Sequence, residues 1–133
     1  MTDLDLIDRY FNSINAEDWG AFAQLWDDRS ELLAVGARPR RGAGEIEAFY
    51  RGLFTPWSKH RDQPVRVLPS GDAVTVEIHF DGTTHDGREL AFDAVDVFDL
   101  EDGRIRKLST WYDLVLVRRL LESGAADPGV VDR

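Results

Sequence analysis

The sequence predicts an α+β fold in which three N-terminal helices pack on a curved, mostly antiparallel sheet. Apolar residues recur at helical spacing up to about residue 54, and from Gln63 onward they alternate with a period of two. A chain of 133 residues, 43% of them hydrophobic and 11% aromatic, can form one domain with a substantial core. We expect residues 1–122 to form that domain and residues 123–133 to be a flexible C-terminal tail.

The first helix is expected over residues 3–15. Its apolar stripe has helical spacing and consists of Leu4, Ile7, Phe11 and Ile14. Tyr10 lies beside this stripe, and Thr2 forms a candidate capping pair with Asp5. The segment is therefore predicted to be an amphipathic helix that buries one face.

Two further helices are expected before most of the sheet. Asp18 is a candidate N-cap for the second helix, whose aromatic face holds Trp19, Phe22 and Trp26. An apolar stretch from Leu32 to Val35 and a turn-rich segment at 38–42 lead into the third helix. Its apolar positions at helical spacing are Ile46, Phe49, Tyr50 and Leu53.

The second half of the chain is predicted to form an antiparallel meander. Its alternating runs are Val65 to Val67, Val74 to Phe80, Leu90 to Phe98 and Arg104 to Tyr112. The connections at residues 69–72, 81–87 and 101–103 have the composition of hairpin turns. The last apolar segment, Leu114 to Leu121, fits either a short helix or an extended strand.

The strand over residues 88–99 is apolar on both faces. Its two apolar rows are Leu90, Phe92, Ala94 and Phe98 on one face, and Ala91, Val95 and Val97 on the other. An antiparallel sheet with one wet face alternates more cleanly than this. The helices can cover one face, and no elements remain to cover the other. We therefore expect a homodimer packed through the outer face of the sheet.

Charge and motif content exclude several classes of function. Sixteen Lys and Arg against 25 Asp and Glu give a net charge of −9, which phosphate backbones and anionic lipids repel, so neither nucleic acid nor membrane is expected as a partner. The chain has no Cys, its three histidines (His60, His79 and His85) are not spaced as a metal pair, and nucleotide-binding glycine motifs are absent. We expect no metal, no cofactor and a cytoplasmic protein.

Asp96 is the first candidate for chemistry, because it is a carboxylate on the face that holds Phe92, Ala94 and Phe98. Burial without a partner disfavours the charged form, so its pKa should rise and the group should act as a hydrogen-bond donor. The alternative is an Asp turned to a wet edge or bonded to a core amide. Tyr10 and Tyr50 are either donors that converge with Asp96 or ordinary aromatics at the edge of the core.

Asp113 follows the last strand and precedes an apolar segment. It is a candidate base at the mouth of a pocket, or the N-cap of a following helix, and the two roles are compatible. Other aromatic residues are candidates for lining a hydrophobic pocket or for ordinary core, namely Trp26, Phe54, Trp57, Phe80, Phe92 and Tyr112. His79 is expected on the opposite face of its strand, in an interface or in solvent.

Several short segments resemble bacterial ketosteroid isomerases in order and spacing. They are residues 9–10, 15–18, 38–42, 48–51, 94–100 and 103–105, and the similarity covers about residues 4–113. The chain is thus identified as a SnoaL-like, ketosteroid-isomerase-like member of the nuclear-transport-factor-2-like superfamily. This resemblance implies a cone-shaped α+β barrel around one apolar pocket.

The resemblance also implies roles for single residues. Tyr10 matches the oxyanion tyrosine of the isomerases, Asp96 the protonated aspartate and Tyr50 a supporting tyrosine, while Trp26 stands where another supporting tyrosine is expected. The isomerase base would fall near Leu33, where this chain has no acid.

The end of the chain resembles the SnoaL-type polyketide cyclases. Asp113 matches their base, although the Gln usual in the following helix is absent. Relatives similar to limonene-epoxide hydrolases have an Arg where this chain has Ala94, so hydrolase chemistry is less expected.

Together these features favour a cofactor-independent enzyme that acts on a small hydrophobic carbonyl compound such as a polyketide or terpenoid. Asp113 would be the base, and Asp96 with Tyr10 would stabilise the enolate oxygen. The reaction is an isomerisation, an aldol-type cyclisation or a dehydration. The alternative is a non-catalytic module of the same fold that binds a hydrophobic ligand or dimerises.

Overall fold

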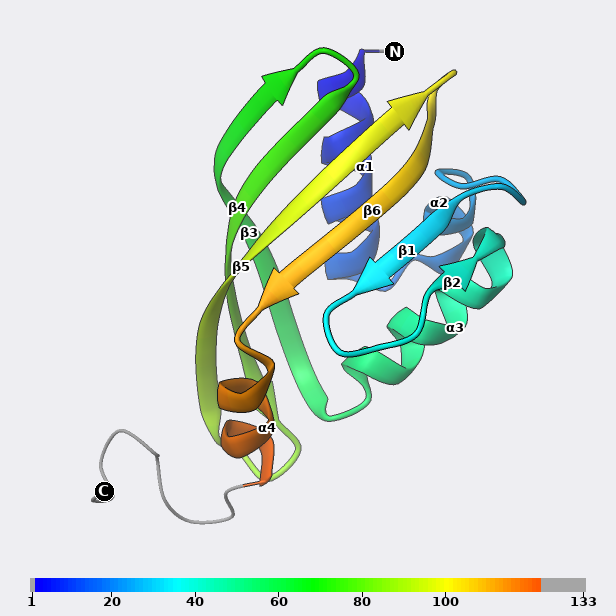
Figure 1. The fold of residues 1–133 in the computed structure, drawn as a ribbon. Coiled ribbons are helices and arrows are strands. Elements are labelled where there is room, and N and C mark those ends of the chain that lie inside the picture. Colours follow the sequence, from blue (N-terminus) through cyan, green and yellow to red (C-terminus); the bar gives the residue numbers. More distant parts are fainter. Residues whose placement is uncertain (1, 123–133) are drawn as a thin grey trace.

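The computed structural model describes residues 2–122 and confirms the predicted α+β class (Figure 1). The elements run in the order α1 (Asp3–Ala16), α2 (Trp19–Ala23), β1 (Glu31–Ala34), β2 (Arg40–Arg41), α3 (Gly42–Phe54), β3 (Trp57–Ser70), β4 (Ala73–Thr84), β5 (Glu89–Glu101), β6 (Arg104–Tyr112) and α4 (Leu114–Glu122). The last segment is thus a helix and not a strand. The tail expected at 123–133 lies outside the described residues.

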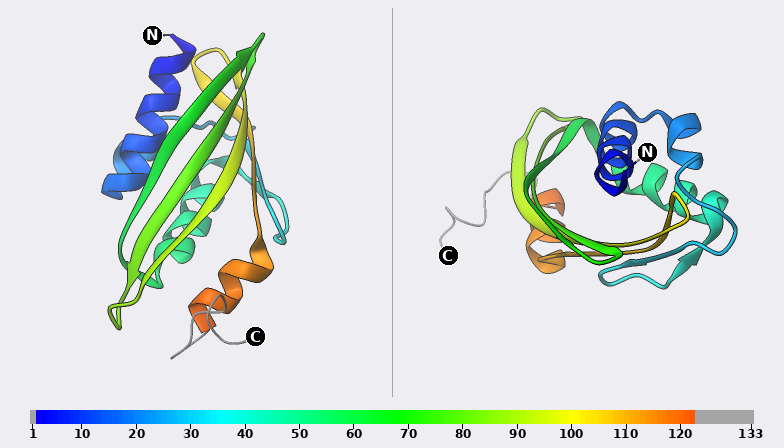
Figure 2. Two further views of the ribbon diagram at one scale, coloured as in Figure 1. Left: turned by 90° about the vertical axis from the view of Figure 1, so that its left-hand side faces the viewer. Right: turned by 90° about the horizontal axis from the view of Figure 1, so that it is seen from above.

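One six-stranded sheet, in the order β2-β1-β6-β5-β4-β3, forms the wall of the fold. Strands β3 to β6 make the predicted antiparallel meander, and β1 joins it in parallel to β6. Asp102 and Gly103 both have positive φ, of 51° and 74°, as the two-residue hairpin between β5 and β6 requires. The sheet curves, and α1, α2 and α3 lie on its concave side (Figure 2).

Local capping signals begin the first two helices as the sequence predicts. Thr2 and Asp5 form a reciprocal capping box at the start of α1, and the Asp18 side chain accepts a hydrogen bond from the Ala21 N–H at the start of α2. Helix α2 is shorter than its aromatic pattern suggests. It ends at Ala23, so Trp26 lies after the helix.

Strands β3 and β4 extend further than the apolar alternation indicates. Strand β3 starts at Trp57, six residues before Gln63, and β4 continues to Thr84 through a segment expected to be a turn. These polar residues are held by the ladder itself, since His60 pairs with Gly82 and Asp62 with Phe80. A side chain at Gly82 would place its Cβ 2.6 Å from the Trp57 ring, so this glycine lets Trp57 lie across the sheet.

Helix α4 lies at the end of the sheet where β4 turns into β5 (Figure 2). The Arg88 guanidinium, beside that turn, donates hydrogen bonds of 2.6 Å to the Leu120 carbonyl and 3.2 Å to the Leu121 carbonyl. A cation at the last turn of a helix satisfies free carbonyls and stabilises the helix dipole. Among residues 2–122, no helix combines the length and apolar character that a membrane crossing needs.

Candidate active site

A cavity opens between the concave face of the sheet and helices α1, α3 and α4. The volume of the cavity is about 90 Å³, which is several times what one water molecule requires. Its walls are mainly aromatic and aliphatic, and its polar side chains are Tyr10, Tyr50, Asp62, Asp96, Thr110 and Tyr112. The cavity is therefore an apolar pocket with a few converging polar groups, as small-molecule sites usually are.

Asp96 projects from β5 into this cavity and is only 4% exposed. Burial raises the pKa of its carboxyl from 3.8 to about 7, a hydrogen bond from Thr110 opposes that rise, and the charge of Asp62 adds to it. Thr110 faces Asp96 across the β5–β6 ladder, so its hydroxyl is in register to donate this bond. A carboxyl in this setting can hold a proton at neutral pH and donate it in a hydrogen bond.

Tyr10 and Tyr50 reach the cavity from two helices and meet there. Their hydroxyl oxygens lie 2.5 Å apart, and both rings are buried. Burial raises the pKa of each phenol well above 10, so both remain protonated donors. The structure thus brings Tyr10, Tyr50 and Asp96 to one cavity, as the sequence pattern indicates.

Asp62 is a second cavity acid that the sequence pattern does not indicate. It lies on β3 in a run of charged and polar residues, where nothing distinguishes it from a surface side chain. The structure places it in the cavity wall, where burial and the charge of Asp81 raise its pKa from 3.8 to about 7. The sequence holds no signal for this position, because the burial of the neighbouring His60 side chain, 2% exposed, is itself visible only in the structure.

Six of the seven aromatic candidates for ligand contact line the cavity, namely Tyr50, Phe54, Trp57, Phe80, Phe92 and Tyr112. Trp26 does not. It is buried against Tyr10, with their ring centroids 6.3 Å apart, and its indole N–H has no hydrogen-bond partner among the described residues. Trp26 follows the end of α2, and this position turns it to the core side of Tyr10.

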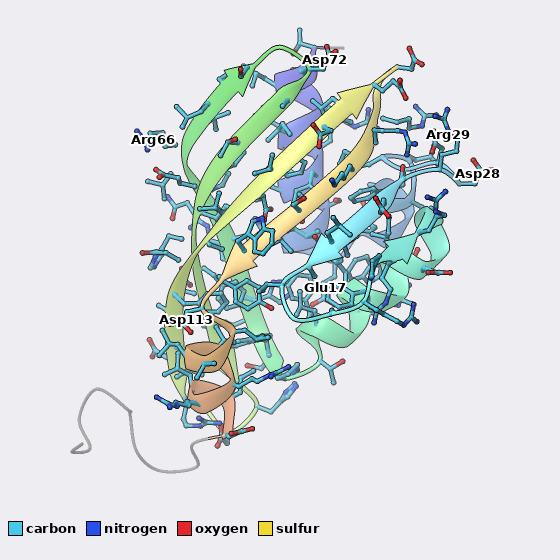
Figure 3. The ribbon with its side chains drawn as sticks, viewed as in Figure 1. Glu17, Asp28, Arg29, Arg66, Asp72 and Asp113 are labelled. Carbon is cyan, nitrogen blue, oxygen red and sulfur yellow. The ribbon has the colours of Figure 1, made fainter. Side chains whose placement is uncertain are left out.

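Asp113 is not among the residues of the cavity wall, although the sequence makes it a candidate base. It is exposed between β6 and α4 (Figure 3), and its Oδ1 accepts a 2.9 Å hydrogen bond from the Leu116 N–H. This is the N-capping role that the sequence left open. The cap orients the carboxylate toward the backbone of α4.

Among residues 2–122, the cavity wall contains no histidine and the structure shows no metal-binding cluster. His79 lies outside the cavity and pairs with Asp93 at 2.9 Å, with the His79 side chain 45% exposed. In this described part of the chain, no three His, Asp or Glu side chains gather closely enough to hold a metal ion.

Comparison with known proteins identifies the domain type. The family model described as a SnoaL-like domain matches residues 7–108. No curated protein sequence matches this chain.

Solved structures share the fold at low sequence identity. An NTF2-like protein of unknown function from Burkholderia pseudomallei K96243 is 18% identical, with a TM-score of 0.84 over 92% of this chain and 100% of that one. A protein from Jannaschia sp. CCS1, described as a candidate SnoaL-like polyketide cyclase, is 18% identical, with a TM-score of 0.83 over 92% of both chains.

An epoxide hydrolase from M. tuberculosis, similar to limonene-epoxide hydrolases, has the same fold. It is 20% identical to this chain, with a TM-score of 0.72 over 88% of this chain and 90% of that one. At these identities the likeness establishes the fold, and the chemistry has to be argued from the cavity itself.

Proposed function

The chain belongs to the SnoaL-like domain family, and on that premise we propose that it is a small-molecule enzyme that performs cofactor-independent acid–base chemistry on a small hydrophobic carbonyl compound. One observation supports this proposal most strongly. The Asp96 carboxyl, with its raised pKa, lies in the same aromatic cavity as the Tyr10–Tyr50 hydroxyl pair. Clefts that combine groups of this kind are typical sites of catalysis.

In the proposed reaction the substrate carbonyl oxygen accepts hydrogen bonds from Asp96 and Tyr10. When a proton leaves the carbon next to the carbonyl, negative charge develops on that oxygen, and donors already in place stabilise it. Tyr50 supports Tyr10 through the 2.5 Å contact between their hydroxyls. Isomerisation, aldol-type cyclisation and dehydration can all begin from this enolate.

The charge of the cavity limits the substrate class. Among the described residues of its wall, Asp62 and Asp96 can carry charge near neutral pH, and no Lys, Arg or His is present. A carboxylate or phosphate group on the ligand would therefore enter without a counter-charge, which is costly in an apolar site. An uncharged, mostly apolar carbonyl compound such as a polyketide or terpenoid fits best. Ala94, which replaces the expected arginine, makes epoxide hydrolysis a weaker proposal.

Deuterium exchange tests this chemistry without knowledge of the physiological substrate. A panel of small cyclic ketones is incubated with the protein in D₂O, and loss of the protons next to the carbonyl is followed by NMR. We expect the wild-type protein to accelerate exchange of at least one ketone. Asp96→Leu and Tyr10→Phe should each slow it about 10²- to 10³-fold, as loss of one oxyanion donor usually does.

Asp8→Asn is the matched control, because it removes one acid from the exposed face of α1. It should leave the exchange rate unchanged. Exchange no faster than in buffer for every ketone would contradict the enzyme proposal.

The second candidate function is a non-catalytic module that binds a hydrophobic ligand. The position of Asp113 outside the cavity wall and the lack of an acid at Leu33 favour it, since both expected bases are then missing. It predicts that the ketones bind, detected as quenching of tryptophan fluorescence by the ligand near Trp57, and do not exchange. Binding together with exchange that depends on Asp96 would exclude this candidate.

A further inference from the structure

We propose that Asp62 is the catalytic base of this cavity and that Asn15 is the residue that positions it. This inference rests on the proposed function, because it names the group that receives the proton. Asp62 lies opposite Phe80 in the β3–β4 ladder, and both line the cavity. Asp96 lies two strands away on β5, so the two acids approach the same space from different parts of the wall.

Asn15 holds the backbone of Asp62 at both of its polar groups. The Asn15 side-chain Oδ1 accepts a 2.8 Å hydrogen bond from the Asp62 N–H, and its Nδ2 donates a 2.9 Å bond to the Asp62 carbonyl. Strand β3 is the edge of the sheet, so within residues 2–122 no strand pairs with these backbone groups on that side. The amide of Asn15 therefore takes the place of a strand and fixes one residue of β3 against α1.

A second contact ties the same part of α1 to the same part of β3. His60 Nε2 lies 2.8 Å from a carboxylate oxygen of Glu17, and the His60 ring stacks on Phe54 with centroids 3.9 Å apart. Glu17 is the C-cap of α1 (Figure 3). These contacts fix the backbone of Asp62 and the ring of His60 against the helices, and a fixed backbone limits where the Asp62 carboxyl can lie in the cavity.

The electrostatic surroundings separate the two acids into different roles. The charged or titratable groups that face Asp62 are Asp81 on β4, Asp96 on β5, Tyr10 on α1 and Tyr50 on α3. Burial raises the pKa of both carboxyls to about 7, and the charge of Asp62 adds to the rise at Asp96, so the pair favours a single negative charge. We assign that charge to Asp62, because Asp96 is the more deeply buried of the two acids. The first acid then accepts a proton while the second donates a hydrogen bond.

The proton moves from the substrate to Asp62 and back, so no other reactant is needed. The C–H bond next to the carbonyl breaks, and its electron pair moves into the C=C bond of the enolate as the carbonyl π pair moves to the oxygen. The proton forms a new O–H bond on Asp62. Asp96 and Tyr10 stabilise the enolate oxygen, and Asp62 then returns the proton to the same or another carbon.

Ketone exchange in Asp62→Asn, Asp113→Asn and Asp8→Asn tests the assignment of the base. Asn is nearly isosteric with Asp and cannot accept the proton, so Asp62→Asn should lose about 10²- to 10⁴-fold in exchange rate. The other two variants should stay within about threefold of wild type. Thermal unfolding of each variant identifies any that has failed to fold, and Asp62→Glu, which keeps the carboxyl, should then recover part of the rate.

The outcomes separate this inference from the proposed function. Exchange that survives in Asp62→Asn and Asp62→Ala overturns the role of Asp62 and leaves the proposed function standing. Loss in Asp113→Asn alone assigns the base to that residue instead. No exchange by the wild-type protein overturns the proposed function and the base assignment together.

Asn15→Ala tests the positioning role separately. Without the two hydrogen bonds to Asp62, kcat for exchange should fall about tenfold while KM for the ketone changes little, because the cavity wall that binds the ketone is intact. The acidic limb of the pH–rate profile, which reports the ionisation of the base, should also move. An equal loss in kcat and stability with an unchanged pH profile would assign Asn15 a purely structural role.

Discussion

Asp96 links the candidate site to the stability of the fold. Its pKa rises from 3.8 to about 7 because folding buries it, so between about pH 4 and pH 7 the folded protein holds a proton that the unfolded chain has lost. The free energy of unfolding must therefore fall as pH rises through this window. At about 1.4 kcal/mol for each pH unit, the decrease from this one group approaches about 4 kcal/mol at neutral pH.

Asp96→Asn should remove most of this dependence, since an amide does not titrate in this range. Urea unfolding at pH 5 and pH 8 measures the effect. Wild type and Asp8→Asn should be more stable at pH 5, while Asp96→Asn should show a smaller difference between the two pH values. Some decrease should remain, because the pKa of Asp62 is raised in the same direction. If the free energy of unfolding of Asp96→Asn fell between pH 5 and pH 8 by as much as that of the wild type, Asp96 would not hold a proton in the folded protein.

These residues also show what the sequence can reveal about the site. Asp96 interrupts an apolar row, so its burial follows from the period-two pattern alone. Asp62 sits between Arg61 and Gln63, and its backbone is held against α1 by Asn15, which is 47 residues away in sequence. The pattern of neighbouring residues cannot predict a contact between residues so far apart in sequence. The position of Asp113 in the sequence fits both a base and an N-cap, and the structure shows the N-cap.

At the scale of elements, α4 closes the cavity and depends on contacts at both of its ends. Val117 and Leu121 of α4 line the cavity, and Arg88 binds the carbonyls at the end of the helix. At its start, Leu114 lies against Gly36 in the loop after β1. A Cβ added to Gly36 would be 2.2 Å from Leu114 Cδ2, and Gly36 has φ of +74°. The loop therefore approaches α4 as closely as only glycine allows.

Gly36→Ala should destabilise the protein by about 1–3 kcal/mol, from steric overlap with Leu114 and from strain at positive φ. The double variant Gly36→Ala, Leu114→Ala should be less destabilised than the sum of the two single variants, because it relieves the overlap. Urea unfolding of all four proteins measures this coupling. If the changes in the free energy of unfolding were strictly additive, Gly36 and Leu114 would not be in steric contact.

At the scale of the whole molecule, no helix or strand of residues 2–122 covers the convex face of the sheet (Figure 2). The second apolar row of β5 predicts an interface on this face, and its members Val95 and Val97 are only partly buried. Val95 also lines a surface groove, whose other lining residues include Val65, Glu77, Asp93 and Trp111, with Trp111 54% exposed and Val65 67% exposed. A second copy of the same face would bury these apolar side chains around a twofold axis.

We therefore predict a homodimer through this face, and Trp111 is the residue that tests it. Trp111→Glu places a charge at the centre of the apolar patch. Burying two such charges near Glu77 and Asp93 would cost several kcal/mol, because the nearby Arg66 and His79 are already paired with these two acids. Sedimentation equilibrium should show a dimer for wild type and a monomer for Trp111→Glu. Leu4→Glu is the matched control, because Leu4 is 48% exposed on α1, on the opposite side of the sheet, and it should leave the dimer intact. A monomeric wild type would mean that the apolar outer face serves another contact or none.

The cavity lies on the concave side, so ketone exchange should persist in the Trp111→Glu monomer if each subunit holds a complete site.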